Sequence, residues 1–345
     1  MRDWWQPRLT LRTAPLLPLS RLFGLLAALR RAAFQLGLKK VRRLPVPVVV
    51  VGNLTVGGSG KTPLVIALAQ ALIEHGWHPG VISRGYGANA QVPREVLASS
   101  IPSEVGDEPL LIRHALAACP VFVGRDRPEA GRALLAAHPQ TTVLISDDGL
   151  QHYALARDFE IAVFDARGAG NGQLLPAGPL REPLSRAGSL DAVVFNGDLP
   201  VNGALASLRA PTWHMRLAPR GFYRLVDPAQ RRMSRDFAAE AGMPGAAQTR
   251  PMIAAVAGIG DPNRFFATLR SLGLSIQEHP FPDHHPYTAA DLAAISAPLI
   301  VMTEKDAIKC ASLRDARVWV LPVAAQLEPG LIAALLEKIR GPQTA

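Results

Sequence analysis

Short runs of apolar, mostly β-branched residues recur along the first half of the chain and predict buried strands. The clearest run covers residues 46–51, and similar runs cover 80–83, 120–123 and 142–145. Runs without polar alternation are typical of parallel strands that are covered on both faces. Helical segments separate these runs, so the alternation over residues 46–164 predicts an α/β fold of the P-loop NTPase type, a parallel sheet with helices on both faces.

The pattern weakens between residues 200 and 248 and then resumes. Within this stretch, residues 212–217 and 221–226 predict a short antiparallel pair. Strand and helix signals return from residue 252 onward. We therefore expect four parts, which are an N-terminal segment (1–43), a lobe with a parallel sheet (44–200), a connector with the antiparallel pair (201–250) and a smaller second α/β lobe (251–345).

Apolar residues near the N-terminus repeat at three- and four-residue steps, which places them on one face of a helix. They are Leu19, Leu22, Phe23, Leu26, Leu29, Ala33 and Leu36. Arginines interrupt the segment, so no uncharged run approaches the roughly 20 residues that cross a bilayer. The pattern favours a helix in the membrane interface, with Trp4 and Trp5 at headgroup level. A helix that packs on the protein's own body is the alternative, and a secretory signal is disfavoured because no small-residue cleavage site follows Leu29.

The distribution of charge supports the membrane interpretation. The 345 residues carry a formal net charge of +9, and residues 1–43 alone hold ten basic residues and one acid. The remaining residues carry as many basic as acidic side chains, so the body of the protein lacks the basic surface expected of nucleic-acid binding. We therefore expect an anionic membrane surface, and no nucleic acid, as a partner. Cys119 and Cys310 show no metal-ligand spacing and indicate a reducing compartment.

A glycine-rich segment follows the first predicted strand directly. It reads Gly57-Gly58-Ser59-Gly60-Lys61-Thr62, and Pro63 then opens a predicted helix. Glycines let backbone N–H groups point at phosphate oxygens, and a helix N-terminus favours negative charge. In this strand–loop–helix context, Lys61 would bridge the β- and γ-phosphates and Thr62 would give its hydroxyl to Mg²⁺. The segment therefore predicts a nucleotide-binding P-loop.

Three details of the sequence bear on which nucleotide the loop binds. The usual P-loop pattern has glycine where this chain has Thr55. Partitioning ATPases place a lysine just before the two glycines, where this chain has Val56. The guanine-specific N-K-x-D segment has its nearest counterpart at residues 303–306, where the lysine is displaced by one position. We therefore expect ATP and not GTP.

Two carboxylates follow a later strand. Asp147 and Asp148 come directly after the run at residues 142–145. P-loop enzymes hold Mg²⁺ with an acidic residue in this position. A turn-forming Asp-Asp-Gly is the alternative interpretation.

Further polar residues lie where a kinase would need a proton acceptor or an anion-binding group. Asp107 precedes a predicted helix and could take the proton of an acceptor hydroxyl, or could cap that helix. Asp283 and His284 follow a predicted strand, with a solvated loop as the alternative. Arg125 and Arg127 suit an anionic phosphate group of a substrate, or could form a solvated pair at a helix start.

Seven segments in order along the chain resemble the tetraacyldisaccharide 4'-kinase family. They are residues 53–62 (NLTVGGSGKT), 83–87 (SRGYG), 106–109 (GDEP), 146–152 (SDDGLQH), 174–183 (LLPAGPLREP), 283–284 (DH) and 303–309 (TEKDAIK). The resemblance covers nearly the whole chain, and Thr55 belongs to that family's loop. It implies an ATP- and Mg²⁺-dependent enzyme that phosphorylates the 4'-hydroxyl of the lipid A disaccharide 1-phosphate precursor.

The resemblance also implies roles for particular residues. Asp107 would accept the hydroxyl proton with His284 paired to it, while Asp147 and Asp148 would serve Mg²⁺ and the phosphates. Nucleotide contacts are expected from Thr55, from residues 57–62, from His152 and from Glu182, which would lie on a lid formed by residues 168–183. Substrate contacts are expected from Asn53, Tyr86 and Arg125.

The same resemblance implies a peripheral or monotopic protein on the cytoplasmic face of the inner membrane, without an obligate protein partner. Two other functions remain alternatives on the sequence. One is a soluble small-molecule kinase, whose N-terminal helix packs on its own body. The other is a nucleotide-hydrolysing switch or metallochaperone, which would release phosphate without an acceptor alcohol.

Overall fold

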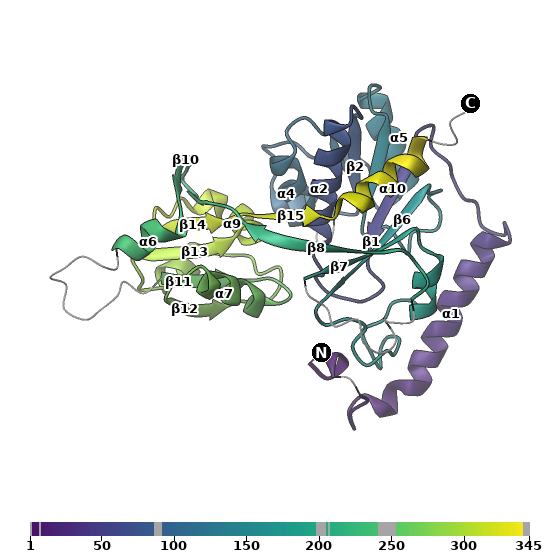
Figure 1. The fold of residues 1–345 in the computed structure, drawn as a ribbon, viewed down its shortest axis with the longest axis horizontal. Helices are drawn as coiled ribbons and strands as arrows, with labels where there is room; N and C mark the ends of the chain where they lie inside the picture. The colour runs from purple at the N-terminus through teal and green to yellow at the C-terminus, as the bar shows by residue number, and fades with distance from the viewer. Residues whose placement is uncertain are drawn as a thin grey trace.

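The chain folds into two lobes, each built around its own sheet (Figure 1). The computed structural model describes residues 2–6, 8–85, 92–197, 205, 208–240 and 253–340. The larger lobe holds the glycine-rich loop. The smaller lobe carries residues that face this loop across a cavity.

The first lobe contains a nine-stranded sheet in the order β15-β8-β7-β6-β1-β5-β2-β4-β3. Its inner strands are parallel, and β1 lies between β5 and β6. The strands are β1 (Val48–Gly52), β2 (Pro79–Ser83), β3 (Arg94–Glu95), β4 (Val121–Val123), β5 (Val143–Asp147), β6 (Phe159–Asp165), β7 (Ala192–Asn196), β8 (Thr212–Pro219) and β15 (Val323–Leu327).

Helices cover both faces of this sheet, as predicted. Val49 and Val51 of β1 belong to the hydrophobic core that includes residues of α2 (Lys61–Glu74), α4 (Asp107–Ala115) and α10 (Pro329–Arg340). Val48 and Val50 belong to the opposite core, which includes α5 (Arg127–Ala137). Because alternate strand residues pack on opposite faces, a continuous apolar run is required. The short helices α3 (Pro102–Val105) and η3 (Leu184–Ser189) complete the lobe.

The second lobe contains a six-stranded sheet in the order β10-β9-β14-β13-β11-β12. Its strands are β9 (Phe222–Arg224), β10 (Asp227–Arg232), β11 (Ile253–Ala257), β12 (Ile276–Pro280), β13 (Leu299–Thr303) and β14 (Val318–Leu321). Its helices are α6 (Ser234–Glu240), α7 (Pro262–Ser271), α8 (Ala289–Ala293), α9 (Glu304–Cys310) and η5 (Ala311–Leu313). The β11 strand is buried between β12 and β13 and parallel to both.

The predicted antiparallel pairing of residues 212–217 with 221–226 is wrong. The first segment lies in β8, which pairs with β7 and β15, and the second contains β9, which pairs with β10 and β14. The predicted second-lobe range 251–345 also differs from the structure, because β15 and α10 return to the first lobe. Figure 1 shows β8 and β15 running side by side between the lobes.

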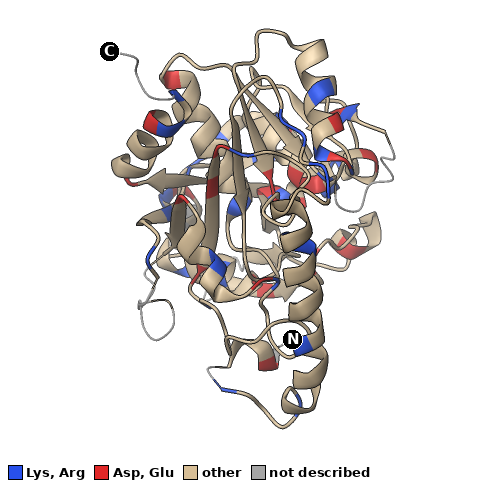
Figure 2. Cartoon of the chain, turned by 90° about the vertical axis from the view of Figure 1, so that its right-hand side faces the viewer, with Lys and Arg blue, Asp and Glu red and all other residues tan. Residues whose placement is uncertain are grey.

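The N-terminal segment forms a helix along the outside of the first lobe. This helix, α1 (Leu17–Gln35), follows the short helices η1 (Arg2–Trp5) and η2 (Ala14–Leu16). Its leucines are half exposed, including Leu22, Leu25 and Leu29 at 52%, 56% and 57%. Figure 2 looks onto α1, whose charged residues are all arginines. None of the helices in the described ranges is long and apolar enough to cross a bilayer.

A prediction tests which apolar positions stabilise the fold. Leu68 of α2 is fully buried against the sheet, so Leu68→Ala should lower the free energy of unfolding by about 2–5 kcal/mol. Leu25→Ala, at a half-exposed helical position, should change it by about 0.5 kcal/mol or less. Urea unfolding followed by circular dichroism measures both values. Equal losses in the two variants would contradict the assignment of the core.

Candidate active site

A cavity of about 1640 Å³ lies between the two lobes and α1. The glycine-rich loop and the first residues of α4 line it from the first lobe. The loop that follows β12 and the start of α9 line it from the second lobe. Phe23 and Arg30 of α1 contribute to its wall as well. The cavity is therefore large enough for a nucleotide together with part of a second ligand.

The glycine-rich loop has the backbone geometry of a phosphate-binding loop. Gly57 and Gly60 have φ values of 92° and 95°, in the left-handed region that favours glycine. Around Gly58 a Cβ would meet nothing within 4 Å, so this part of the loop is open. The α2 helix begins at Lys61, two residues before the predicted start at Pro63. Its free N–H groups therefore lie at the loop, where they can hold an anion.

Side chains behind the loop fix its shape. Asn53 donates to the carbonyl of Gly57 at 3.0 Å and accepts a hydrogen bond from the Lys61 ammonium at 3.1 Å. Arg167 donates to the Gly58 carbonyl at 2.8 Å, and Asn196 donates to the Ser59 carbonyl at 2.9 Å. These contacts position the carbonyl groups away from the space that an anion would occupy.

Two predicted ligand contacts require correction. Asn53 is completely buried and Thr55 is 3% exposed, and neither lines the cavity. Asn53 instead orients Lys61, and Thr55 forms an isolated bridge with Leu180. The predicted lid is also different, because its backbone is bonded to the P-loop segment through Val56 N to Pro179 O and Arg181 N to Leu54 O. This loop therefore forms part of the wall of the site.

The two aspartates at the end of β5 have different environments. Asp147 is buried and accepts a hydrogen bond from Ser83, while its Oδ1 atom has no partner among the described residues. Burial, followed by the charge of Glu108, raises the pKa of Asp147 to about 7. Asp148 lies 3.6 Å from Lys61 and 3.1 Å from Arg181. Although burial acts in the opposite direction, Lys61 and Arg181 lower the pKa of Asp148.

This arrangement fits a bound Mg²⁺. A buried carboxylate oxygen without a partner lies in the same cavity wall as Thr62, and hard cations prefer oxygen ligands. The Oγ atom of Ser59 is likewise buried without a partner in the described part of the chain. Asp147, Asp148 and Thr62 are thus the side chains that would hold the ion.

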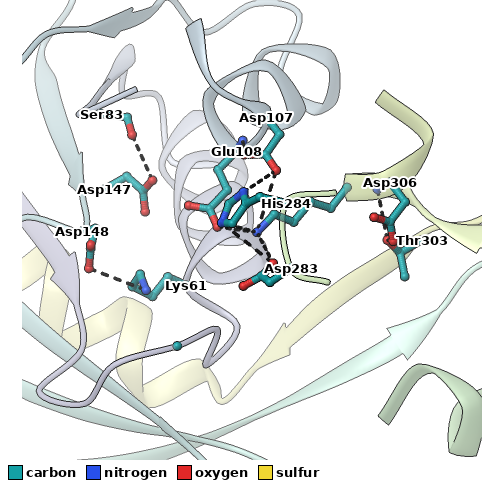
Figure 3. Close-up of polar contacts among 12 residues, drawn as sticks. Lys61, Ser83, Asp107, Glu108, Asp147, Asp148, Asp283, His284, Thr303 and Asp306 are labelled. Atoms are coloured by element: carbon teal, nitrogen blue, oxygen red, sulfur yellow. Dashed lines mark hydrogen bonds and ion pairs between the residues drawn. The ribbon is translucent and has the colours of Figure 1, made fainter. Parts of the chain in front are cut away.

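A hydrogen bond between residues that line the cavity joins the two lobes. Asp107 is the first residue of α4, directly after Gly106, and is 5% exposed. Its Oδ2 atom lies 2.9 Å from Nδ1 of His284, which follows β12 (Figure 3). His284 has a φ of 62°, and its N–H donates to the Gly258 carbonyl. Asp107 therefore does not act as the N-cap, a position that Gly106 occupies.

The pKa values of Asp107 and His284 are shifted in opposite directions. Burial acts to raise the pKa of Asp107, but the hydrogen bond with His284 and the charge of Lys305 outweigh it and lower the pKa. The hydrogen bond with Asp107 raises the pKa of His284 above its ordinary value. Asp107 is thus ionised at neutral pH and is able to receive a proton.

Lys305 belongs to the same cluster, although no role was predicted for it beyond its place in the displaced guanine motif and in the family segment at residues 303–309. Its ammonium nitrogen lies 3.0 Å from Glu108 and 3.5 Å from Asp283. The available signal was its position directly after β13, at the edge of the second sheet where the parallel strands end. Arg181 pairs with Asp148 in the site, and it was predicted only as part of the segment 174–183 and not as a site residue.

The remaining predicted residues lie in several places. Glu182 and His152 both line the cavity. Glu182 accepts hydrogen bonds from Gln151 and Tyr153, and burial raises its pKa. Burial and the charge of Arg127 lower the pKa of His152 to about 4, so its imidazole is neutral.

The two predicted arginines differ in their contacts, and the predicted tyrosine is not among the described residues. Both Arg125 and Arg127 line the cavity. Arg127 is 2% exposed and donates to the carbonyls of Gly124 and Asp147, so it is not a solvated residue and its guanidinium supports the end of β5. Tyr86 lies outside the described residues.

Comparisons with known proteins agree with one another. Residues 12–340 match the family model described as LpxK, tetraacyldisaccharide-1-P 4'-kinase. A protein of Dechloromonas aromatica named tetraacyldisaccharide 4'-kinase is 51% identical, over 100% of this chain and 98% of its own. One of Janthinobacterium with the same name is 53% identical, over 94% and 92%. A crystal structure of LpxK from Aquifex aeolicus in complex with ATP superimposes with a TM-score of 0.75 at 29% identity, covering 94% of this chain and 99% of that one.

A prediction follows from the Asp107–His284 hydrogen bond. Because this bond raises the pKa of His284, Asp107→Asn should lower that pKa toward or below its ordinary value of about 6.5. An NMR titration with isotope-labelled histidine measures the change. The His284 signal is assigned from its loss in His284→Gln, and His285 serves as the internal control. An unchanged His284 pKa in Asp107→Asn would contradict the pairing.

Proposed function

The chain belongs to the tetraacyldisaccharide-1-phosphate 4'-kinase family and transfers phosphate from ATP to the 4'-hydroxyl of its lipid substrate, and we propose how its residues perform this reaction. The observation that supports the proposal most strongly is the cavity between the lobes. Its wall contains both a phosphate-binding loop and an ionised, buried carboxylate, Asp107. The γ-phosphate and the acceptor hydroxyl would meet between them.

In this proposal Asp107 is the general base. Its carboxylate takes the proton of the 4'-hydroxyl while that oxygen forms a bond to the γ-phosphorus and ADP leaves with the bridging oxygen. His284 orients the carboxylate through the 2.9 Å hydrogen bond. The pair therefore gains one proton during the transfer and must begin without it.

On the nucleotide side, the backbone of residues 57–61 cradles the phosphates and Lys61 bridges them. Asn53 and Asp148 hold the Lys61 ammonium at 3.1 and 3.6 Å, which limits its movement. Mg²⁺, held by Thr62, Asp147 and Asp148, would neutralise charge on the β- and γ-phosphates. Ionised Asp147 is favoured when the ion is bound, because its raised pKa reflects burial without sufficient positive charge.

We further propose that α1 places the enzyme on the cytoplasmic face of the inner membrane. The half-exposed leucines of α1, the absence of acidic residues from this helix and the two tryptophans before it suit an anionic interface. Phe23, Leu26, Ala27 and Arg30 of the same helix line the cavity. A lipid whose acyl chains stay in the membrane could therefore present its sugar to Asp107.

The decisive experiment supplies both substrates. Purified protein is incubated with γ-labelled ATP, Mg²⁺ and tetraacyldisaccharide 1-phosphate, and the products are separated by thin-layer chromatography. Label should move to the lipid at its 4' position. Release of labelled phosphate with no label on the lipid would instead indicate a nucleotide-hydrolysing switch.

The general-base role predicts a selective loss of turnover. Asp107→Asn removes the proton acceptor at nearly constant volume, so kcat should fall by about 10²- to 10⁴-fold. Binding of ATP, measured by calorimetry, should change little, because Asp107 is not part of the P-loop and its carboxylate is paired with His284. Asp227→Asn, outside the cavity, is the matched control. Unchanged kcat in Asp107→Asn would remove this residue from the mechanism.

The membrane role predicts a loss of vesicle binding. Replacing Leu22, Leu25 and Leu29 together with glutamine should reduce partition onto vesicles with anionic lipid by about tenfold or more, since each buried side chain contributes about 1.5–3 kcal/mol. Ile73→Gln, at an exposed position on α2, is the control and should leave partition unchanged. Flotation with lipid measures both. Equal partition of the triple variant and the wild type would refute the role of α1.

A further inference from the structure

The ammonium group of Lys305 lies where the two lobes meet. Lys305 is the second residue of α9, and its side chain is 18% exposed. Its Nζ atom lies 3.0 Å from Glu108 Oε1 and 3.9 Å from Asp107 Oδ2 of the first lobe, and 3.5 Å from Asp283 Oδ1 of the second. A cation at this point offsets the repulsion among three carboxylates that come from different lobes.

The same ammonium faces the ring of His284. Lys305 Nζ lies 3.5 Å from Nε2 of His284, on the opposite side of the ring from Asp107. An ammonium group can only donate hydrogen bonds, so Lys305 favours a lone pair on Nε2, whereas Asp283 Oδ1, 3.8 Å from the same nitrogen, favours a proton there. With the lone pair on Nε2, the ring proton is on Nδ1 and is donated to Oδ2 of Asp107. Asp107 and Lys305 thus favour the same neutral tautomer.

We propose that Lys305 is a positioning residue for the phosphoryl transfer. It keeps Asp107 ionised and His284 neutral, so that the pair lacks the additional proton that it takes up in the reaction, and it holds the two side chains together across the lobes. The inference rests on the proposed function, because the pair has to begin the reaction without the proton that it will take from the acceptor.

The charges around the pair determine the direction of the effect. Asp107 and Glu108 face it from α4, Asp283 from the loop after β12, and Lys305 and Lys309 from α9. Lys305 acts to lower the pKa of Asp107 and the pKa of His284, whereas Asp107 and Asp283 act to raise that of His284. Although burial opposes it, Glu108, Asp107 and Asp283 raise the pKa of Lys305 itself, so the ammonium stays charged through the neutral range.

Removal of this charge should therefore raise the pKa of both members of the pair. The pair would hold an additional proton up to a higher pH. The acidic limb of the profile of kcat/KM against pH would therefore move to higher pH. If Lys305 only held the lobes together, its removal would lower kcat/KM at every pH without shifting the acidic limb. The position of the limb separates these two roles.

The test compares Lys305→Met and Lys305→Arg with the wild type, using ATP, Mg²⁺ and tetraacyldisaccharide 1-phosphate over a range of pH. In Lys305→Met the acidic limb should move up by about 0.5–1 pH unit, and in Lys305→Arg it should stay in place. Lys338→Met, which removes an exposed lysine paired with Asp191, is the control for the substitution and should match the wild type. A limb at the wild-type position in Lys305→Met would overturn the proposal.

A second readout does not depend on turnover. In the absence of substrate, the pKa of His284 measured by NMR should rise in Lys305→Met, opposite in sign to the change in Asp107→Asn. Lys305→Gln provides the same test if the methionine variant does not fold. A wild-type protein that never labels the lipid would refute the proposed function, whereas an unchanged His284 pKa in a folded Lys305 variant would refute the role of Lys305.

Discussion

The hydrogen bond between Asp107 and His284 makes the chemistry of this protein depend on the relative position of its two lobes. Asp107 begins a helix of the first lobe, and His284 follows a strand of the second, 177 residues later. The strands β8 and β15 pair with each other as they run between the lobes, so they control how closely the two sides approach. A small rotation about these strands would separate the carboxylate from the imidazole without unfolding either sheet. In the proposed mechanism, Asp107 and His284 therefore act together only when the lobes are close.

Two buried aspartates in the wall of the cavity have pKa values that their neighbours shift in opposite directions. The carboxylate of Asp147 receives one hydrogen bond from Ser83 and lies where burial raises its pKa. The carboxylate of Asp107 faces His284 and Lys305, which hold its pKa down despite similar burial. Environments that push the pKa values of two like groups apart assign them different tasks. Asp147 lacks enough positive charge near it to offset its burial and therefore suits the binding of a cation. Asp107, whose negative charge is offset by His284 and Lys305, suits proton transfer.

The sequence predicted the local elements well because their signals are local. A continuous apolar run, glycines and a helix start within about 20 residues identify β1, the loop and α2 without any long-range information. The pairing of β8 and β9 was not predictable in this way, since a hydrophobic pattern indicates a strand but not its partner. Asn53 and Thr55 lie beside the phosphate-binding residues in sequence, but their side chains point behind the loop. Lys305 was missed because Glu108, its nearest carboxylate, is 197 residues away.

The N-terminal segment packs on the first lobe and is connected through Arg167 to the phosphate-binding loop. Ser20 of α1 donates to the Leu174 carbonyl at 2.7 Å, and Trp4 donates to that of Pro176 at 3.0 Å. The ring of Trp5 lies 4.3 Å from the guanidinium of Arg167, which itself donates to the Gly58 carbonyl. In the proposed membrane orientation, these contacts would hold the phosphate-binding loop at a fixed height above the lipid surface. A sugar attached to membrane-embedded acyl chains would then find both the phosphate and Asp107 within the same cavity, because the helix that faces the lipid also forms part of the cavity wall.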